Sequence, residues 1–284
     1  MLPPLETLTT FTLLGIRFWD AILDKQITDG LSVTAWPLDQ PNRLTTATPT
    51  RSSIYAFHHL PGMRRWEQAT GAEALAASPG DRTRFVITIT DSQQRYFPTV
   101  FTVDLPLPYL GIFPTAVPTS PPAPAHPGFY LFSAPTRPTA PGLAVLRTQL
   151  VQANSPQPAA FAVLEAELLG QTWYGFSDAR GIATLLFPYP PFTSTPGTSP
   201  PGGPPLSEQQ WTVTLRARYE PTAQTVLSGT SLPTLNSLFA QTAATLWPTT
   251  SGTAVPQLTF TLIYGQELVL HTSPLSTLWV SPGP

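Results

Sequence analysis

Two adjacent histidines, His58 and His59, form the only tight cluster of imidazoles in the chain. Adjacent side chains of an extended segment point to opposite faces, so one metal ion could not easily use both. We expect one ring to face the interior or a neighbouring segment and the other to face solvent. His126 and His271 are isolated, and no pattern brings them to this pair.

Acidic residues offer two further candidate sites. Asp20, Asp24 and Asp29 could be imagined around a calcium ion, but calcium loops need oxygen ligands at closer, regular spacing. Turn and strand-end roles explain these aspartates better. Glu165 and Glu167 share one face of a predicted strand, at a spacing that an acid/base pair could use. Solvated glutamates beside Arg147 or Arg180 are the simpler interpretation.

Sequence motifs give no support for an enzyme. The chain has no nucleophile elbow, phosphate loop, dinucleotide fingerprint or zincin motif. It has no cysteine, which excludes disulfides and thiolate metal sites. We therefore predict a non-enzymatic protein with no catalytic residue, no cofactor and no metal.

The composition favours a loop-rich protein that contacts other proteins. Of 284 residues, 36 are proline and only 11% are charged, whereas a typical domain has about 25% charged residues. Proline is confined to loops, edges and extended connectors, and a surface with few charges tends to be covered by a partner. Lys25 is the only lysine, and arginine is the cation that interfaces favour. A GC-rich genome would enrich arginine and proline as well.

Charge and hydropathy bear on location and partners. A net charge of −2 argues against nucleic-acid binding, which needs a basic patch. The start of the chain lacks the basic and continuous apolar regions of a signal peptide, and no apolar run is long enough for a membrane span. We expect a protein that is made and assembled in the cytoplasm, without a membrane span.

The residue pattern in the first third of the chain predicts β-strands. Residues 31–36 alternate strictly between apolar and polar, and residues 11–18, 54–57, 84–90 and 96–105 show related patterns. Strands at this spacing, with no convincing helix among them, predict a β-sandwich over residues 9–105.

A proline-rich connector is predicted over residues 106–142. Such sequence favours a semi-rigid polyproline conformation. The aromatic run Phe129 to Phe132 interrupts it and is unsuited to exposure in water. We therefore expect the connector to lie along the protein and to be held there by this run.

A second sandwich is predicted over residues 143–284, with a proline-rich insert at 188–205. Residues 211–219 give its clearest strand, with Trp211, Val213, Leu215, Ala217 and Tyr219 on one face. Near-helical spacing from Leu235 to Leu246, after Pro233, predicts one short helix over 233–247. Gly265 and Gln266 predict a hairpin between strands 257–264 and 267–272.

Several runs resemble known families. The runs TDGLSVTAWPL, SSIYAFHHLPG and FVITITDSQQRYFPTVFTVDLP resemble the carboxypeptidase-regulatory-like, transthyretin-like sandwich domain, although Ser53 stands where that pattern prefers glycine. The layout that includes YLFSAPTRPTAPGLAVLRTQL, SDARGIATLLFPYPPF, LSEQQW and YGQELVL resembles proteins encoded with phage-tail-like contractile injection systems. This resemblance implies a tail or baseplate subunit.

Together these observations predict an all-β protein with two immunoglobulin-like or transthyretin-like β-sandwich domains, a proline-rich connector and one short helix near the C-terminus. The predicted function is that of a structural subunit in a phage-tail-like particle. Its partners would be other subunits of the assembly, copies of itself among them. The residues predicted to contact partners are Phe129, Tyr130, Phe132, Arg64, Arg65 and Trp66.

The alternative function is a carbohydrate-binding or adhesin-type sandwich protein. Such proteins stack sugars on exposed aromatic rings. Trp19, Trp36, Trp66 and Trp173 are the candidate platforms, although the alternating pattern favours a core position for Trp36 and for Trp211.

Overall fold

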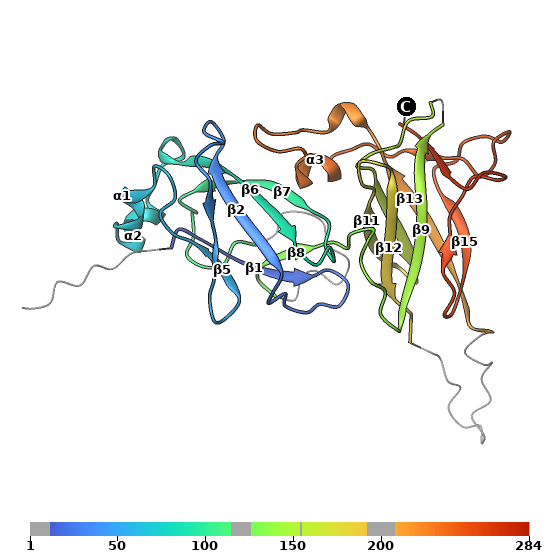
Figure 1. Ribbon diagram of the computed structural model, residues 1–284, viewed down its shortest axis with the longest axis horizontal. Helices are drawn as coiled ribbons and strands as arrows, with labels where there is room; N and C mark the ends of the chain where they lie inside the picture. The colour runs from blue at the N-terminus through green and yellow to red at the C-terminus, as the bar shows by residue number, and fades with distance from the viewer. Residues whose placement is uncertain (1–11, 115–125, 154, 192–207, 284) are drawn as a thin grey trace, which may run out of the picture.

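The computed structural model describes residues 12–114, 126–153, 155–191 and 208–283. Strands dominate these ranges and form four sheets, shown in Figure 1. The α-helices of the described part have only four or five residues. The expected all-β class is therefore confirmed.

Residues 14–131 form two of the sheets, here called the first sheet pair. One has the strand order β4-β5-β1-β8 and the other β3-β2-β6-β7. The strands are β1 (Leu14–Asp20), β2 (Leu31–Pro37), β3 (Thr45–Thr46), β4 (Thr48–Pro49), β5 (Ile54–Phe57), β6 (Thr83–Asp91), β7 (Thr99–Leu105) and β8 (Phe129–Leu131).

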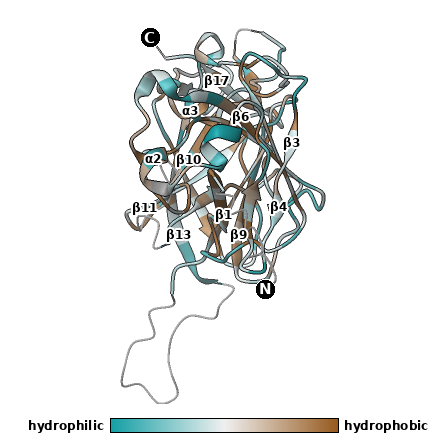
Figure 2. Cartoon of the chain, turned by 90° about the vertical axis from the view of Figure 1, so that its left-hand side faces the viewer, coloured by the Kyte–Doolittle hydropathy of each residue, from teal (hydrophilic) through white to brown (hydrophobic). Residues whose placement is uncertain are grey.

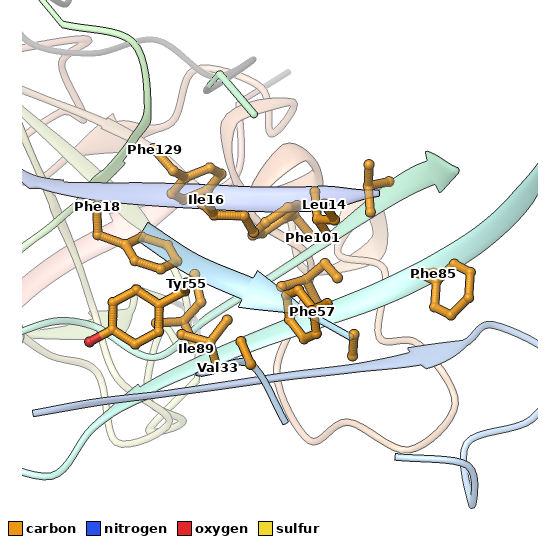
Figure 3. Packing of buried hydrophobic residues seen from close by; sticks show 14 of the residues in the cluster. Leu14, Ile16, Phe18, Val33, Tyr55, Phe57, Phe85, Ile89, Phe101 and Phe129 are labelled. Carbon is orange, nitrogen blue, oxygen red and sulfur yellow. The ribbon is translucent and has the colours of Figure 1, made fainter. Parts of the chain in front are cut away.

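The core of the first sheet pair lies between its two sheets. In β1 every second residue is buried, which places Leu14, Ile16 and Phe18 on the inner face. They share one buried cluster with Val33 and Phe85 of the opposite sheet (Figure 3). The strict alternation predicted for residues 31–36 arises because successive side chains of β2 point to opposite faces of its sheet.

The segment expected to match a glycine-containing pattern contains a left-handed residue. Ser53, just before β5, has a φ of +54°. This is the region that glycine enters without a steric penalty and other residues rarely occupy. Ser53 therefore occupies a backbone region that favours glycine.

Residues 143–281 form the second sheet pair. One sheet has the order β11-β10-β13-β15, and the other has the order β12-β9-β17-β14 with β16 also beside β9. The strands are β9 (Leu143–Gln152), β10 (Val163–Leu168), β11 (Gln171–Phe176), β12 (Ile182–Pro188), β13 (Gln210–Arg218), β14 (Thr245–Leu246), β15 (Leu258–Ile263), β16 (Leu268–Val269) and β17 (Leu278–Ser281).

The predicted inner face of β13 is confirmed. Val213, Leu215, Ala217 and Tyr219 are buried, and Trp211 packs against the same cluster while partly exposed. The predicted hairpin after β15 is wrong, because β16 pairs in parallel with β9 of the other sheet. Most of the predicted insert at 188–205 lies outside the described residues.

The predicted helix over 233–247 is much shorter in the structure. α3 spans Leu235–Phe239, with the Thr234 side chain accepting a hydrogen bond from the Ser237 amide at its start. Beyond Ala240 the chain is extended, and Leu246 pairs with Val280 of β17. Pairing with the end of the chain takes precedence over local helical spacing, which is a weak determinant on its own.

Two short helices precede β6. α1 spans Arg64–Glu67 and α2 spans Gly71–Leu75; α2 begins with a capping box between Thr70 and Glu73. Single 3₁₀ turns follow at Pro79–Asp81 and, in the second half, at Pro221–Ala223. The end of the molecule that carries α2 faces the viewer in Figure 2.

The predicted connector contains a strand. Residues 115–125 of it lie outside the described part, but β8 pairs in parallel with β1 through Phe129, Tyr130 and Leu131. The first sheet pair therefore extends well beyond residue 105, where the predicted sandwich ended. The expectation that the aromatic run holds this segment against the protein is confirmed.

Candidate functional site

The three aromatic residues predicted to contact a partner are buried inside the chain. Phe129, Tyr130 and Phe132 are each at most 4% exposed. Phe129 stacks on Phe101 at 4.5 Å between ring centres, and the Tyr130 hydroxyl donates to Asp24 at 3.0 Å. The prediction of an intermolecular contact is wrong here, because these rings are covered by other segments of the same chain.

Phe132 joins the two sheet pairs instead. Its ring lies 5.0 Å from that of Phe176 and 5.6 Å from that of Phe239, while Phe97 stacks on Phe176 at 5.1 Å. Tyr174 completes this group, which we call the aromatic junction. Each such ring pair contributes about 0.5–1.5 kcal/mol beyond area burial. The junction belongs to the same buried cluster as the core of the first sheet pair.

A second contact between the sheet pairs is made by residues 224–234, here called the arm. Leu227 and Leu232 of the arm pack on the outer face of β2, β6 and β7, against Trp36, Val86 and Val100. Figure 1 shows this loop, in orange, reaching from the α3 region toward the first sheet pair. The two halves of the chain are therefore connected on two sides.

The arm is closed by its own hydrogen bonds. The Thr234 amide donates to the Thr225 carbonyl at 2.9 Å, and Val226 forms a bridge with Pro233. Gly229, with a φ of +83°, lies so near the first sheet pair that a Cβ there would be 2.9 Å from Pro41. Such a closed loop can press on a neighbouring sheet without unfolding, since hydrogen bonds tie its two ends together.

A buried polar network fastens the end of the connector. Arg137 donates to Asp20 at 2.6 Å and to Ser133 at 2.9 Å, and the Tyr96 hydroxyl also donates to Asp20. Burial raises the pKa of Tyr96 well above its ordinary value, and the nearby charge of Asp20 raises it further. The residues between β8 and β9 are thereby tied to the end of β1.

Arg64, Arg65 and Trp66 lie on α1, and two of them line a surface hollow of about 370 Å³. The Arg65 guanidinium lies 4.9 Å from the centre of the Trp66 ring. Both arginines are exposed, whereas Trp66 is 9% exposed and belongs to the core cluster. The arginines can meet a partner, while the tryptophan mainly anchors α1.

Two carboxylates on the rim of this hollow cap short helices. The Thr70 amide and hydroxyl donate to Glu73 and lower its pKa. The Ser78 hydroxyl and amide lower the pKa of Asp81 in the same way. Both carboxylates are therefore engaged in hydrogen bonds that stabilise the starts of these helices.

The histidine pair differs from expectation. His58 and His59 are both exposed, and the nearest acidic partner of His59 is the buried Glu67, at 3.9 Å. A turn in which His59 has a φ of +58° ends the strand before either ring can point inward. Within the described ranges, no three histidine, aspartate or glutamate side chains gather around a common point where a metal ion could bind.

Glu165 and Glu167 pair with arginines, but not with the predicted ones. Glu165 accepts a hydrogen bond from Arg218 and Glu167 one from Arg216, both on the neighbouring strand β13. β10 lies inside its sheet, so the cross-strand register decides the partners. These are diagonal ion pairs on a sheet surface.

The predicted sugar platforms are mostly covered. Trp36 and Trp173 are buried, and Trp173 stacks on Phe187 at 4.8 Å. The Trp19 ring is stacked against His126 at 4.4 Å. Trp66 is buried, and the Arg65 guanidinium lies over its ring. None of these four rings therefore presents an open face of the kind that stacks on a sugar.

Sequence reasoning missed the aromatic junction and the arm. Phe132, Phe176 and Phe239 are far apart in sequence, and each looks like an ordinary core residue. Leu227 and Leu232, on either side of Gly229, carried the only signal for the arm: two large apolar residues in a segment with turn chemistry.

The chain matches no protein-family profile and no curated protein sequence. Solved structures show only weak likeness, among them the following three. The Bacillus anthracis TIE protein is 9% identical with a TM-score of 0.25; the match covers 89% of this chain and 44% of that one. GBS52, the minor pilin of Streptococcus agalactiae, is 9% identical with a TM-score of 0.21, covering 95% and 97% of the two chains.

The third is a Ca²⁺-stabilised adhesin by which an Antarctic bacterium binds ice. It is 12% identical with a TM-score of 0.14, and the match covers 86% of this chain and 66% of that one. At these TM-scores the likenesses identify neither a family nor a function. No helix in the described ranges has the length and apolar character needed to cross a membrane.

Proposed function

We propose that this chain is a non-enzymatic structural subunit of a multiprotein particle, placed in the baseplate or tail of a contractile injection system assembled in the cytoplasm. Each sheet pair would be an immunoglobulin-like or transthyretin-like sandwich. The particle type rests on the sequence resemblance described above. The structural role rests on the geometry.

The observation that carries the structural role is the double attachment between the sheet pairs. The aromatic junction buries Phe132 and Phe176 between them, and the arm holds the outer face of β6 through Leu227 and Leu232. Domains joined only by small polar contacts usually move relative to each other about a hinge. Two attachments on different sides oppose such motion. A rigid two-part body suits a subunit that holds its neighbours at fixed positions.

The charged groups support the same proposal. Arg84 pairs with Asp104, and hydrogen bonds from Arg84 lower the pKa of that carboxyl. For Asp91, burial alone would raise the pKa, but hydrogen bonds from Arg95 and from backbone amides outweigh it and lower the pKa. Charges paired within the fold leave fewer free ionic groups on the surface, which suits a subunit whose faces meet neighbours.

Glycan binding is less well supported, because the candidate tryptophan rings are covered by other parts of the chain. The hollow beside Trp66 is the remaining candidate, and its carboxylates cap helices. A glycan array that binds the full chain and loses binding with Trp66→Ala would favour this alternative.

The proposal is tested by tagging the full chain in cells that carry its own gene and isolating particles by sedimentation. We expect the chain to co-sediment with tube and sheath subunits at fixed stoichiometry. The variant Arg64→Glu/Arg65→Glu should reduce this incorporation, while Arg180→Glu, a single charge reversal on an exposed turn of the second sheet pair, serves as the control for reversing an arginine elsewhere on the surface. Recovery of the chain only as a free species would overturn the proposal.

A further inference from the structure

β15 is an edge strand of the second sheet pair. β15 pairs with β13 on one side, and within the described ranges no strand pairs with its other side. In Figure 1 it lies at the end of the molecule opposite the first sheet pair. The following segment does not fold back as a hairpin, because β16 joins the other sheet.

The direction of the backbone groups follows from the register. The Tyr264 amide donates to the Gln209 carbonyl at 2.9 Å, and hydrogen-bonded pairs alternate along an antiparallel ladder. Thr259, Thr261 and Ile263 therefore point their amides and carbonyls away from β13. The Ile263 carbonyl accepts from the Gln266 amide at 3.2 Å, which leaves five of these six groups with no hydrogen-bond partner among the residues that the structure describes.

This edge also lacks the features that normally prevent strand addition. Natural edges are protected by charges, proline, bulges or very short strands. The six residues of β15 are uncharged and contain no proline, and the register with β13 is continuous. Other edge strands do have such protection: β3, β4 and β14 have only two residues each. β7 carries Asp104, and β11 lies so close to β12 that a Cβ on Gly175 would be 3.0 Å from the Thr184 carbonyl.

We propose that β15 pairs antiparallel with β15 of a second copy of this chain, about a two-fold axis at Thr261. Thr261 then opposes its own counterpart, and Thr259 opposes Ile263. Two bonds between the Thr261 residues, and two from Ile263 amides to Thr259 carbonyls, form without breaking any existing bond. Two such sheets join into one continuous sheet across the dimer.

The side chains in this register are self-complementary. Leu258 and Leu262 face the core of the second sheet pair, and Phe260 packs partly exposed against it. Phe260 would oppose Leu262 on this inner face, and threonines would meet on the outer face, where Thr–Thr pairs are favourable. No like charges oppose each other. A strand of different sequence has no such match at every position, so a second copy is the occupant that fits best.

This inference deepens the proposed function and rests on it, because it names one partner of the structural subunit. A single pair of six-residue strands buries less than a standard interface, so the dimer is expected to be weak in dilute solution. Within a particle, neighbouring contacts raise the effective concentration and make the same pairing persistent.

The absence of cysteine allows a direct test. In the proposed register the two Thr261 Cα atoms are about 5.5 Å apart, inside the range of about 4.4–6.8 Å that disulfides span. Thr261→Cys should therefore cross-link into a covalent dimer under mild oxidation. Thr259→Cys is the matched control, since its two copies are offset by four residues, about 14 Å.

Selective cross-linking of Thr261→Cys supports the proposal. Equal cross-linking of both variants, or none of Thr261→Cys in concentrated protein, overturns it.

Sedimentation velocity gives an independent measurement on the uncross-linked chain. Thr261→Pro should weaken the dimer about tenfold or more, because it removes two intermolecular hydrogen bonds. The fold tolerates proline on an edge strand where the amide faces outward.

Thr261→Lys places two like charges opposite each other and provides a second blocking variant if the proline variant misfolds. An unchanged association constant in a folded blocking variant would also overturn the proposal. Loss of the cross-link in a chain that still enters particles would refute this pairing alone. A cross-linked dimer that never enters particles would refute the proposed function alone.

Discussion

The buried pair between Arg137 and Asp20 gives the sharpest test of how the connector is held. Arg137→Met removes the guanidinium but keeps most of the apolar volume. Asp20, 2% exposed, would lose the cationic partner that lies 2.6 Å away. Removing one member of a buried ion pair costs about 3–5 kcal/mol. The Tyr96 hydroxyl and two amides still donate to Asp20, so we expect the lower part of this range.

The matched control is Arg84→Met, which removes a guanidinium from a pair with Asp104. Both side chains of this pair are about half exposed, at 57% and 44%. Exposed pairs contribute about 0–1 kcal/mol. The free energy of unfolding should therefore fall by at least about 2 kcal/mol more in Arg137→Met than in Arg84→Met.

Urea unfolding at neutral pH measures both changes, with tryptophan fluorescence and circular dichroism recorded together to check for a single transition. Adding Asp20→Asn to Arg137→Met should restore part of the lost stability, because the unpaired charge disappears. A loss of less than about 1 kcal/mol in Arg137→Met, or no recovery in the double variant, would refute the assignment of a buried, structure-holding ion pair.

Four further predictions follow from the contacts between and within the sheet pairs. Phe176→Ala removes a ring common to three contacts of the aromatic junction and should cost about 3–5 kcal/mol; calorimetry should then resolve two transitions, and a single one at an unchanged temperature would contradict the junction's role. Gly229→Val should push the arm off the first sheet pair, seen as faster hydrogen exchange in β6, whereas unchanged protection would show that the arm contributes little. Ser53→Gly should raise stability by about 0.5–1 kcal/mol in thermal or urea unfolding, because glycine relieves the left-handed strain; a loss would contradict this. The raised pKa of Tyr96 means that its contribution is complete below about pH 10, the unfolded pKa, and is lost as the pH rises further, so Tyr96→Phe should flatten the alkaline fall in stability.

Much of the strand content could be predicted because alternation is a local property. In β2, β6 and β13 the core-facing residues, such as Val33, Ile87 and Leu215, recur at every second position. The other face is mostly polar, except where Trp36 and Val86 lie under the arm. The all-β class follows from many such segments together with abundant proline. The polar turn before β12 is equally local, since Asp178 accepts hydrogen bonds from the amides two and four residues later.

Contacts between distant segments could not be predicted in this way. The helix expected over 233–247 stops at Phe239 because Leu246 pairs with the last strand of the chain. The partners of Glu165 and Glu167 follow from the register of β10 against β13, which no single strand encodes.

The candidate contact residues show the same division. The sequence by itself determined that Phe129, Tyr130 and Phe132 would not remain in water, since three large rings in a proline-rich segment must be covered. Only the tertiary structure decided that this chain covers them, through β1 on one side and Phe176 on the other. The need to bury large apolar side chains can be recognised from the local sequence. The surface that buries them depends on which strands the whole chain brings together.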